Sequence, residues 1–272
     1  GAAEVTVVTD GTVSLPLSFM LPSTPRADAE ALYAANGTTH EALVGQINVT
    51  VVRIGDATIV IDSGGADFMP TMGKFGDNLA AAGIAPESVT HVVFTHAHGD
   101  HLWGIIDPLE DATRFPKARH LMSAAEVDTW TRPGVENEVP EALKGMAIGT
   151  QRRLGQLKDR IETVKPGTEI VPGVAVVDTA GHTPGHISVL VGSGGDRLLV
   201  GGDVISNPIV SFARPDWPWG PDWDKDKGAA SRKRTLEMLA TEKVALLGYH
   251  LPWPGLGRVE TKDAAFRLVQ GG

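Results

Sequence analysis

The sequence predicts an α/β fold, because apolar runs with the two-residue period of strands alternate along the chain with stretches of helical period. Turns separate these runs and are marked by glycine and proline, which number 32 and 18 among the 272 residues. Hydrophobic residues make up 42% and charged residues 21%, as in an ordinary globular protein. These glycines and prolines therefore mark turns between the elements of a packed fold.

Turn and cap signals delimit the elements of the first part of the chain. Asp-Gly at 10–11 and Gly-Asp at 55–56 are each typical of a hairpin turn. The Ser-x-x-Glu motif that starts at Ser123 is a capping box, which begins a helix. The predicted strands are Val5–Thr9, Ile47–Ile54, Thr58–Ile61 and His91–Phe94, and the predicted helices are Lys74–Ala82, Ser123–Trp130 and Glu141–Asp159.

The second part of the chain repeats some features of the first. Gly55–Asp62 and Gly195–Asp203 have similar sequences, and a buried strand later in each half leads into a histidine, His96 or His250. We therefore expect two similar halves packed face to face. The predicted elements here are the strands Val174–Val177, Ile187–Val191 and Leu198–Val200, the helix Ser231–Leu239 and a last buried strand, Val244–Leu247.

Charge and cysteine content exclude several classes of function. Lys and Arg number 24 against 33 Asp and Glu, a net charge of −9, which argues against binding to nucleic acid or to anionic membranes. Cysteine is absent, which excludes disulfides, thiol catalysis and thiolate metal sites. No apolar run approaches the roughly 20 residues of a membrane helix, and no signal peptide is visible, so the compartment stays open between cytoplasm and periplasm.

The strongest functional signal is the sequence THAHGDH, which directly follows a predicted strand. Residues two apart share a face of extended backbone, so His96 and His98 point into one metal site. Gly99 lets the chain turn, so Asp100 and His101 face a second position nearby. Nitrogen and oxygen ligands of this kind suit a divalent ion such as zinc. The alternative is a solvated polar loop.

Three later strands also end in histidine or aspartate. His182 lies closer to a strand end than His186, so we expect His182 to complete a three-histidine site and His186 either to orient a ligand or to be a satisfied core histidine. Asp203 has two oxygens that suit a bridge between ions about 3.5–4 Å apart, although a turn aspartate is the alternative. His250 would supply nitrogen to the second metal.

Tryptophans gather shortly after Asp203. Trp217, Trp219 and Trp223 lie within seven residues, beside prolines that exclude regular helix. Trp217 and Trp219 are candidates for an aromatic wall that binds an apolar substrate over the metals. A surface loop or a subunit contact is an equally weighted alternative.

The histidines and aspartates, in this order, resemble the metallo-β-lactamase superfamily, as does the strand-and-glycine motif at Val60–Gly65. The resemblance covers about residues 5–260. It implies an αββα sandwich in which helices flank two mixed β-sheets, and a single domain over residues 1–272 with two divalent metal ions, Zn²⁺ above all. It implies one metal on His96, His98 and His182, a second on Asp100, His101 and His250, and Asp203 as the bridge.

Within the superfamily, the chain resembles methyl parathion hydrolase-like and lactonase-like members. This resemblance implies a zinc-dependent hydrolase of small ester, lactone or phosphotriester substrates and places Phe68 and Trp130 in the substrate pocket. The region near Leu143 lacks the aromatic residue of methyl parathion hydrolase, which makes ester or lactone hydrolysis the better expectation. Related enzymes are often dimers, so a homodimer is one expected assembly. The supporting segments are Asp10–Pro16, Phe115–Pro116, Ile170–Gly173, His182–His186 and His250–Gly255.

The expected nucleophile is a hydroxide between two zinc ions, since a metal lowers the pKa of bound water from about 15.7 to about 7. Asp100 would hold the hydroxide and relay its proton, Asp203 would bridge, and His186 and Asp62 would orient ligands. The alternatives are a β-lactamase or thioesterase of the same fold, or an iron-dependent oxidoreductase such as a persulfide dioxygenase.

Overall fold

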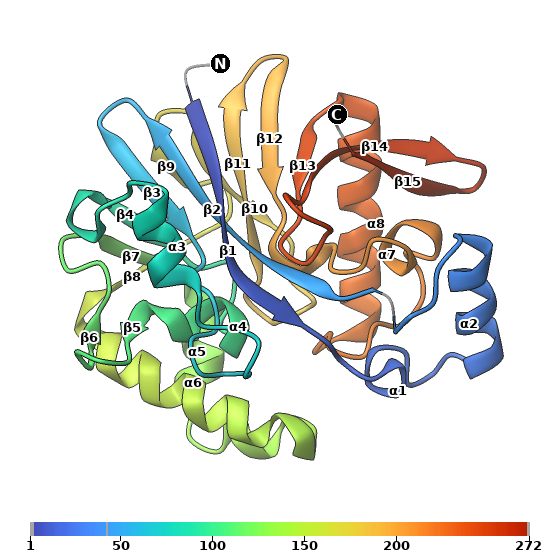
Figure 1. Cartoon of the computed structure of the whole chain (residues 1–272), viewed down its shortest axis with the longest axis horizontal. Helices are drawn as coiled ribbons and strands as arrows, with labels where there is room; N and C mark the ends of the chain where they lie inside the picture. Colours follow the sequence, from blue (N-terminus) through green and yellow to red (C-terminus); the bar gives the residue numbers. More distant parts are fainter. Residues whose placement is uncertain (1–2, 42, 271–272) are drawn as a thin grey trace.

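The computed structural model describes residues 3–41 and 43–270. Two β-sheets lie face to face, and helices cover the outer side of each sheet (Figure 1). Each sheet combines parallel and antiparallel neighbours. The predicted αββα sandwich with two mixed sheets is therefore confirmed.

The first sheet is antiparallel among its first three strands and parallel across the rest. In spatial order it contains β1 (Ala3–Val13), β2 (Gly45–Ile54), β3 (Ala57–Ile61), β4 (His91–Val93), β7 (Arg119–Ser123) and β8 (Ile161–Val164).

The second sheet is antiparallel except where β12 and β13 run parallel. In spatial order it contains β15 (Ala265–Gln270), β14 (Leu256–Lys262), β13 (Ala245–Leu247), β12 (Asp196–Val200), β11 (Ile187–Ser193), β10 (Val174–Asp178) and β9 (Glu169–Val171). A separate hairpin pairs β5 (Ile106–Asp107) with β6 (Ala112–Thr113).

Eight α-helices and several 3-10 turns connect the described strands. The α-helices are α1 (Leu17–Met20), α2 (Arg26–Ala35), α3 (Phe75–Ala81), α4 (Gly99–Leu102), α5 (Ala124–Thr131), α6 (Lys144–Leu157), α7 (Val210–Ala213) and α8 (Lys225–Glu242). The 3-10 turns are Pro86–Ser88, Trp103–Ile105, Val135–Asn137, Glu141–Leu143, Lys158–Arg160 and Gly202–Val204.

Alternation of side chains along the strands builds three apolar layers. Ile59 and Ile61 of β3 point between the sheets, whereas Val60 points to the helix side. On β11, Val189 points between the sheets and Leu190 points toward the layer that α8 covers. Each fully buried side chain of this size contributes about 1.5–3 kcal/mol, so the layers hold the two sheets in fixed register.

The internal similarity of the sequence corresponds to a repeated topology. The antiparallel pair β2–β3 is followed by β4, parallel to β3, and the antiparallel pair β11–β12 is followed by β13, parallel to β12. In both halves, the chain leaves the last strand at the same edge of the sandwich. The two ligand-bearing ends therefore meet.

The hairpin predicted at Asp10-Gly11 is wrong. β1 continues through both residues and only shifts register between Thr9 and Gly11. The bulge turns Asp10 inward, where its carboxylate accepts backbone N–H groups of Gly65 and Phe75 at 2.7 Å each. The backbone donors around this buried carboxylate, and not a turn, explain the Asp-Gly pair.

Two predicted boundaries also differ from the structure. Val244–Leu247, expected as the last buried strand, contains β13, and the largely exposed hairpin β14–β15 follows it and extends the sheet. The helix predicted at Ser231–Leu239 begins six residues earlier, where the Asp224 side chain accepts the Lys227 N–H at 3.0 Å. The predicted cap at Ser123 is confirmed, since its hydroxyl accepts the N–H of Glu126 at 3.2 Å.

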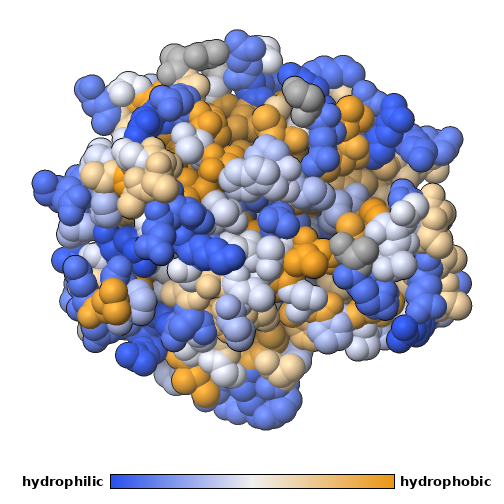
Figure 2. Space-filling view, viewed as in Figure 1, coloured by the Kyte–Doolittle hydropathy of each residue, from blue (hydrophilic) through white to orange (hydrophobic). Residues whose placement is uncertain are grey.

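A groove lined largely by apolar side chains lies at the end of the sandwich opposite His96 and His182. The groove has a volume of about 1030 Å³ and is lined by Val5, Ile54, Leu190 and Leu198 among others. Figure 2 shows a hydrophobic region over β11 and β12 within a largely hydrophilic face. Among the described helices, none is long and apolar enough to cross a membrane.

Candidate metal centre

Four loops at one edge of the sandwich carry the predicted ligands. The loop after β4 bears His96 and His98, the loop between β10 and β11 bears His182, the turn after β12 bears Asp203, and the loop after β13 bears His250. Strand ends fix these loops on a rigid frame, which is where functional side chains concentrate. The structure brings all seven predicted ligands together at this edge, with Asp100 and His101 on α4.

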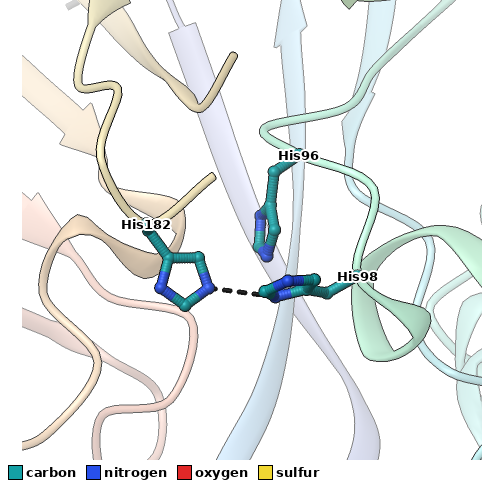
Figure 3. A group of neighbouring side chains, drawn as sticks. All are labelled: His96, His98 and His182. Carbon is teal, nitrogen blue, oxygen red and sulfur yellow. Dashed lines mark hydrogen bonds between the residues drawn. The ribbon is translucent and has the colours of Figure 1, made fainter. Parts of the chain in front are cut away.

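One group of ligands consists of His96, His98 and His182. Their candidate ligand atoms lie within 4.8 Å of one another, and His182 Nε2 is 3.0 Å from His98 Nδ1. Figure 3 shows the three rings turned toward a common space, with His182 coming from the loop opposite the other two. His186 is not in this group.

Further groups adjoin the first. Asp100, His101 and His250 lie within the same mutual distance of 4.8 Å, and so do His96, His101 and Asp203. His250 Nε2 is 3.3 Å from Asp100 Oδ2. The edge of the sandwich therefore offers two adjacent positions for a cation.

Asp203 lies between the two positions. Its Oδ2 is 3.3 Å from His182 Nε2, whereas its Oδ1 is 3.2 Å from the Nε2 atoms of both His101 and His250. The two oxygens thus face different histidine groups. This is the arrangement expected of a carboxylate that bridges two ions.

Three buried polar atoms here make no hydrogen bond of good geometry among the described residues: His96 Nε2, and the pair His101 Nε2 and Asp203 Oδ1, which lie 3.2 Å apart. An unpaired buried polar atom costs about 1–3 kcal/mol, and native structures rarely leave one without a reason. All three point into the two cation positions. The residues therefore fit divalent metal ions held by nitrogen and oxygen alone.

Hydrogen bonds at the far side of the rings select the nitrogen that faces the metal positions. His101 Nδ1–H donates to Asp62 Oδ2 at 2.8 Å, and Asp62 is itself held by the backbone N–H and hydroxyl of Thr95 at 2.8 Å each. His250 Nδ1–H donates to the Gln46 carbonyl at 2.9 Å. Each ring therefore presents Nε2 to the cation positions, and Asp62 occupies the outer position predicted for it.

His186 holds the backbone of the bridging residue. Its Nε2 accepts the N–H of Asp203 at 2.9 Å, and its Nδ1–H donates to the Thr179 hydroxyl at 2.8 Å. The chain of donors continues through Ser188 to the Gly201 carbonyl. Burial holds the pKa of His186 well below its usual value, so the ring is neutral and accepts this bond.

Sequence analysis did not assign a role to Glu126 beyond its cap, although it joins two ligand loops. Its Oε1 accepts the Ala97 N–H at 2.9 Å and the Trp130 indole N–H at 2.6 Å. Its Oε2 accepts the Thr183 hydroxyl at 2.7 Å and the Gly185 N–H at 3.0 Å. Burial raises the pKa of Glu126, and these four donors oppose that rise. The carboxylate ties the His98 loop of one sheet to the His182 loop of the other.

Protonation differs sharply across the centre. Burial alone would lower the pKa of His101, but the carboxylates of Asp203, Asp100 and Asp62 raise it to about 10. Burial lowers the pKa of His98 to about 3. Burial would raise the pKa of Asp100, but His101 and His250 bring it to about 2. Before a metal binds, the centre therefore holds ionised carboxylates beside a protonated His101.

A cavity of about 490 Å³ opens onto the centre. Its base is formed by five of the candidate metal ligands: His98, Asp100, His182, Asp203 and His250. Most of the other lining side chains are aliphatic, aromatic or proline, and no lysine or arginine lines it among the described residues. The cavity therefore suits a neutral, apolar ligand whose reacting group reaches the metal ligands.

Two of the four predicted substrate contacts line this cavity. Phe68 does, packed edge-on against Trp103 at 5.0 Å, and so does Trp219. Trp130 does not, because it is completely buried behind His98, where it donates to Glu126. Trp217 does not either, since it packs against the α1–α2 segment outside the cavity. The structure therefore replaces those two expectations with packing roles.

A family model described as Metallo-beta-lactamase superfamily matches residues 42–249, and the chain belongs to this superfamily. It resembles the solved structure of AidC, a dizinc quorum-quenching lactonase in complex with a product, N-hexanoyl-L-homoserine. The TM-score is 0.93 with 26% identity over 100% of this chain and 95% of that one. A second structure, the hydrolase AbOPH, has a TM-score of 0.90 and 28% identity over the same shares of the two chains.

Two relatives match shorter parts of the chain. The uncharacterized protein YobT of Bacillus subtilis is 28% identical over 168 residues, which cover 58% of this chain and 67% of YobT. Metallo-beta-lactamase domain-containing protein 1 of Xenopus laevis is 29% identical over 191 residues, which cover 68% of this chain and 66% of that protein. Fold, family and candidate ligands together make the chain a metal-binding hydrolase of the superfamily.

Metal binding should release protons at neutral pH. His101, with a pKa of about 10, is protonated there, and an ion can bind Nε2 only after that proton leaves. Affinity should therefore rise between about pH 6 and pH 8, by up to about tenfold per pH unit for each proton released. Calorimetry in two buffers of different ionisation enthalpy measures the protons. His91→Gln, a substitution outside the centre, is the control and should leave the proton release unchanged. A metal affinity independent of pH would contradict the protonation of His101.

Glu126→Gln should lower the metal affinity of the centre. An amide keeps the shape but offers one oxygen to four donors, which leaves at least one buried N–H unpaired at about 1–3 kcal/mol. We expect metal affinity to fall by roughly 10–100-fold, as for other groups behind ligands, in a competition titration. Glu162→Gln, at an exposed pair with Arg119, is the matched control and should change neither affinity nor stability measurably.

Proposed function

We propose that the protein hydrolyses neutral acyl lactones and related esters with two divalent metal ions, Zn²⁺ above all. The observation that carries this proposal is the apolar cavity without cationic side chains, which ends at the paired metal ligands. Similarity to the lactonase AidC across the whole chain supports it. A neutral ring ester with an apolar acyl chain matches the cavity in both charge and polarity.

The ions would supply a strong nucleophile at neutral pH and a Lewis acid for the carbonyl oxygen. The residues of the chain orient these events. Asp100 lies at the cavity base, with Oδ2 3.3 Å from His250 Nε2 and 3.7 Å from His101 Nε2, so it can hold the attacking water and take up its proton. Asp203 keeps the two histidine groups at a fixed separation, which places nucleophile and carbonyl beside each other.

Charge in the cavity weighs against two alternatives. A β-lactam carries a carboxylate and a glutathione thioester carries several charges, and the described lining offers no lysine or arginine to bind them. Neutral phosphotriesters meet no such obstacle and form the second candidate class. Iron-dependent oxidation is distinguished by oxygen uptake during turnover.

A hydrolysis panel tests the proposal. Zinc-loaded protein should cleave an N-hexanoyl lactone and aryl esters with higher kcat/KM than a β-lactam or a glutathione thioester. The kcat/KM values should differ by roughly tenfold or more, because an uncompensated charge in the cavity should cost at least about 1.4 kcal/mol. Asp203→Asn is the blank. Faster cleavage of the anionic substrates than of every neutral one would contradict the proposal.

Trp219→Ala should raise KM for long acyl chains. Trp219 lines the cavity, and loss of its apolar surface should cost about 1–2 kcal/mol, so KM for a hexanoyl substrate should rise by roughly 5–30-fold while an acetyl ester changes little. Trp217→Ala is the matched control, because that ring lies outside the cavity. Equal effects of the two variants on both substrates would count against a specific acyl site.

A further inference from the structure

A buried ion pair lies behind one metal ligand. His182 Nδ1–H donates to Asp222 Oδ1 at 2.9 Å, and Asp222 Oδ2 accepts from Arg232 Nη2 at 2.6 Å. Only 2% of Asp222 and 3% of Arg232 is exposed, and neither lines the substrate cavity. The pair therefore reaches the reaction only through the histidine.

The surrounding chain leaves Asp222 little freedom. The Trp223 N–H donates to the His182 carbonyl at 2.8 Å, and the Lys225 ammonium donates to the carbonyls of Gly220 and Asp222. At Gly228 of α8, a Cβ atom would lie 2.4 Å from Asp222 Oδ2. The carboxylate thus lies in a slot shaped by its own segment and by α8.

Arg232 is held just as firmly. Its Nη1 donates to the Pro215 carbonyl at 3.0 Å and to the Trp217 carbonyl at 3.4 Å. A guanidinium fixed at two points presents its remaining N–H groups to Asp222 in one direction. The tryptophan-rich segment therefore positions a charge pair in addition to carrying Trp219.

The two histidine groups have different supports. His182 of the first group depends on Asp222. Asp62 holds His101 of the second group directly, and its other donors are the backbone N–H and hydroxyl of Thr95, whose hydroxyl also lies 3.1 Å from His96 Nδ1. The described hydrogen bonds do not link Asp222 with Asp62. A change at Asp222 should therefore affect the first group selectively, whereas a change at Asp62 reaches His101 directly and His96 through Thr95.

We propose that Asp222 and Arg232 are positioning residues that set the metal affinity of the group His96, His98 and His182. Asp222 holds the His182 ring with Nε2 toward the ion, and Arg232 acts only through Asp222. This inference rests on the two-metal part of the proposed function and is independent of the substrate.

The test is a two-step Zn²⁺ titration against a chromophoric chelator, with Co²⁺ spectra as a second readout. His98→Ala and His250→Ala assign the steps, since each belongs to one group. Asp222→Asn should weaken the first-group step by roughly 10–100-fold and leave the other within about threefold. Asp62→Asn, the comparison variant, should weaken the second-group step and, through Thr95 and His96, also the first-group step.

Arg232 is tested by coupling. Arg232→Met should weaken the same step, and the double variant Asp222→Asn, Arg232→Met should be no weaker than Asp222→Asn alone. Because Asp222→Asn leaves a buried cation unpaired and can impair folding, Gly228→Ala provides a second route, since it displaces Asp222 without changing charge. Gly155→Ala, on α6 with open space around it, is its control.

Additive losses, or equal weakening of both steps, would overturn the proposal. So would a lower melting temperature with both affinities unchanged, because a merely structural pair would behave that way. Failure of the proposed function is distinguishable: a protein that binds two ions normally but cleaves no lactone would contradict the substrate assignment and leave this inference standing.

Discussion

The position of one carboxylate between histidines from separate loops is the constraint on which this structure depends. Asp203 faces His182 with one oxygen and His101 and His250 with the other. Such a convergence of polar groups at a buried edge is unfavourable without a cation, as the unpaired Nε2 of His96 indicates. The sandwich makes it possible, because the apolar layer between the sheets fixes the strand ends from which the loops leave.

The outer hydrogen bonds convert this convergence into a defined centre. Two of these bonds hold ligand rings, from Asp62 to His101 and from Asp222 to His182. His186 holds the backbone N–H of Asp203, and Glu126 joins two ligand loops. The carboxylates of Asp62, Glu126 and Asp222 are buried, and each accepts a hydrogen bond from a loop other than its own. The metal ligands are therefore oriented before an ion binds, and the largely apolar cavity above them has no lysine or arginine among its described lining residues.

Sequence analysis could find the ligands because they are local. The spacing of His96, His98, Asp100 and His101 is contained in one short segment, and Asp203 and His250 directly follow apolar strands. The repeated topology was predictable from the similar halves, and the two mixed sheets followed from the resemblance to the superfamily. The α/β class was predictable from the alternation of strand and helix patterns alone.

The rest depends on contacts between distant segments. Trp130 was expected at the substrate, but its indole turns to Glu126 and away from the cavity, which the position of an aromatic residue in a sequence does not reveal. Asp222 is 40 residues from its histidine, in a segment whose tryptophans dominate the pattern. A carboxylate followed by an arginine ten residues later is too common to signal a buried pair. At Asp10, the local turn signal was overridden by tertiary donors.

The central claim is tested most directly by diffraction from crystals of the zinc-loaded protein, with anomalous data on both sides of the zinc edge. Two anomalous peaks about 3.5–4 Å apart are expected. One should lie among His96, His98 and His182 and the other among Asp100, His101 and His250, with an oxygen of Asp203 directed to each. A single peak, or peaks away from Asp203, would contradict it.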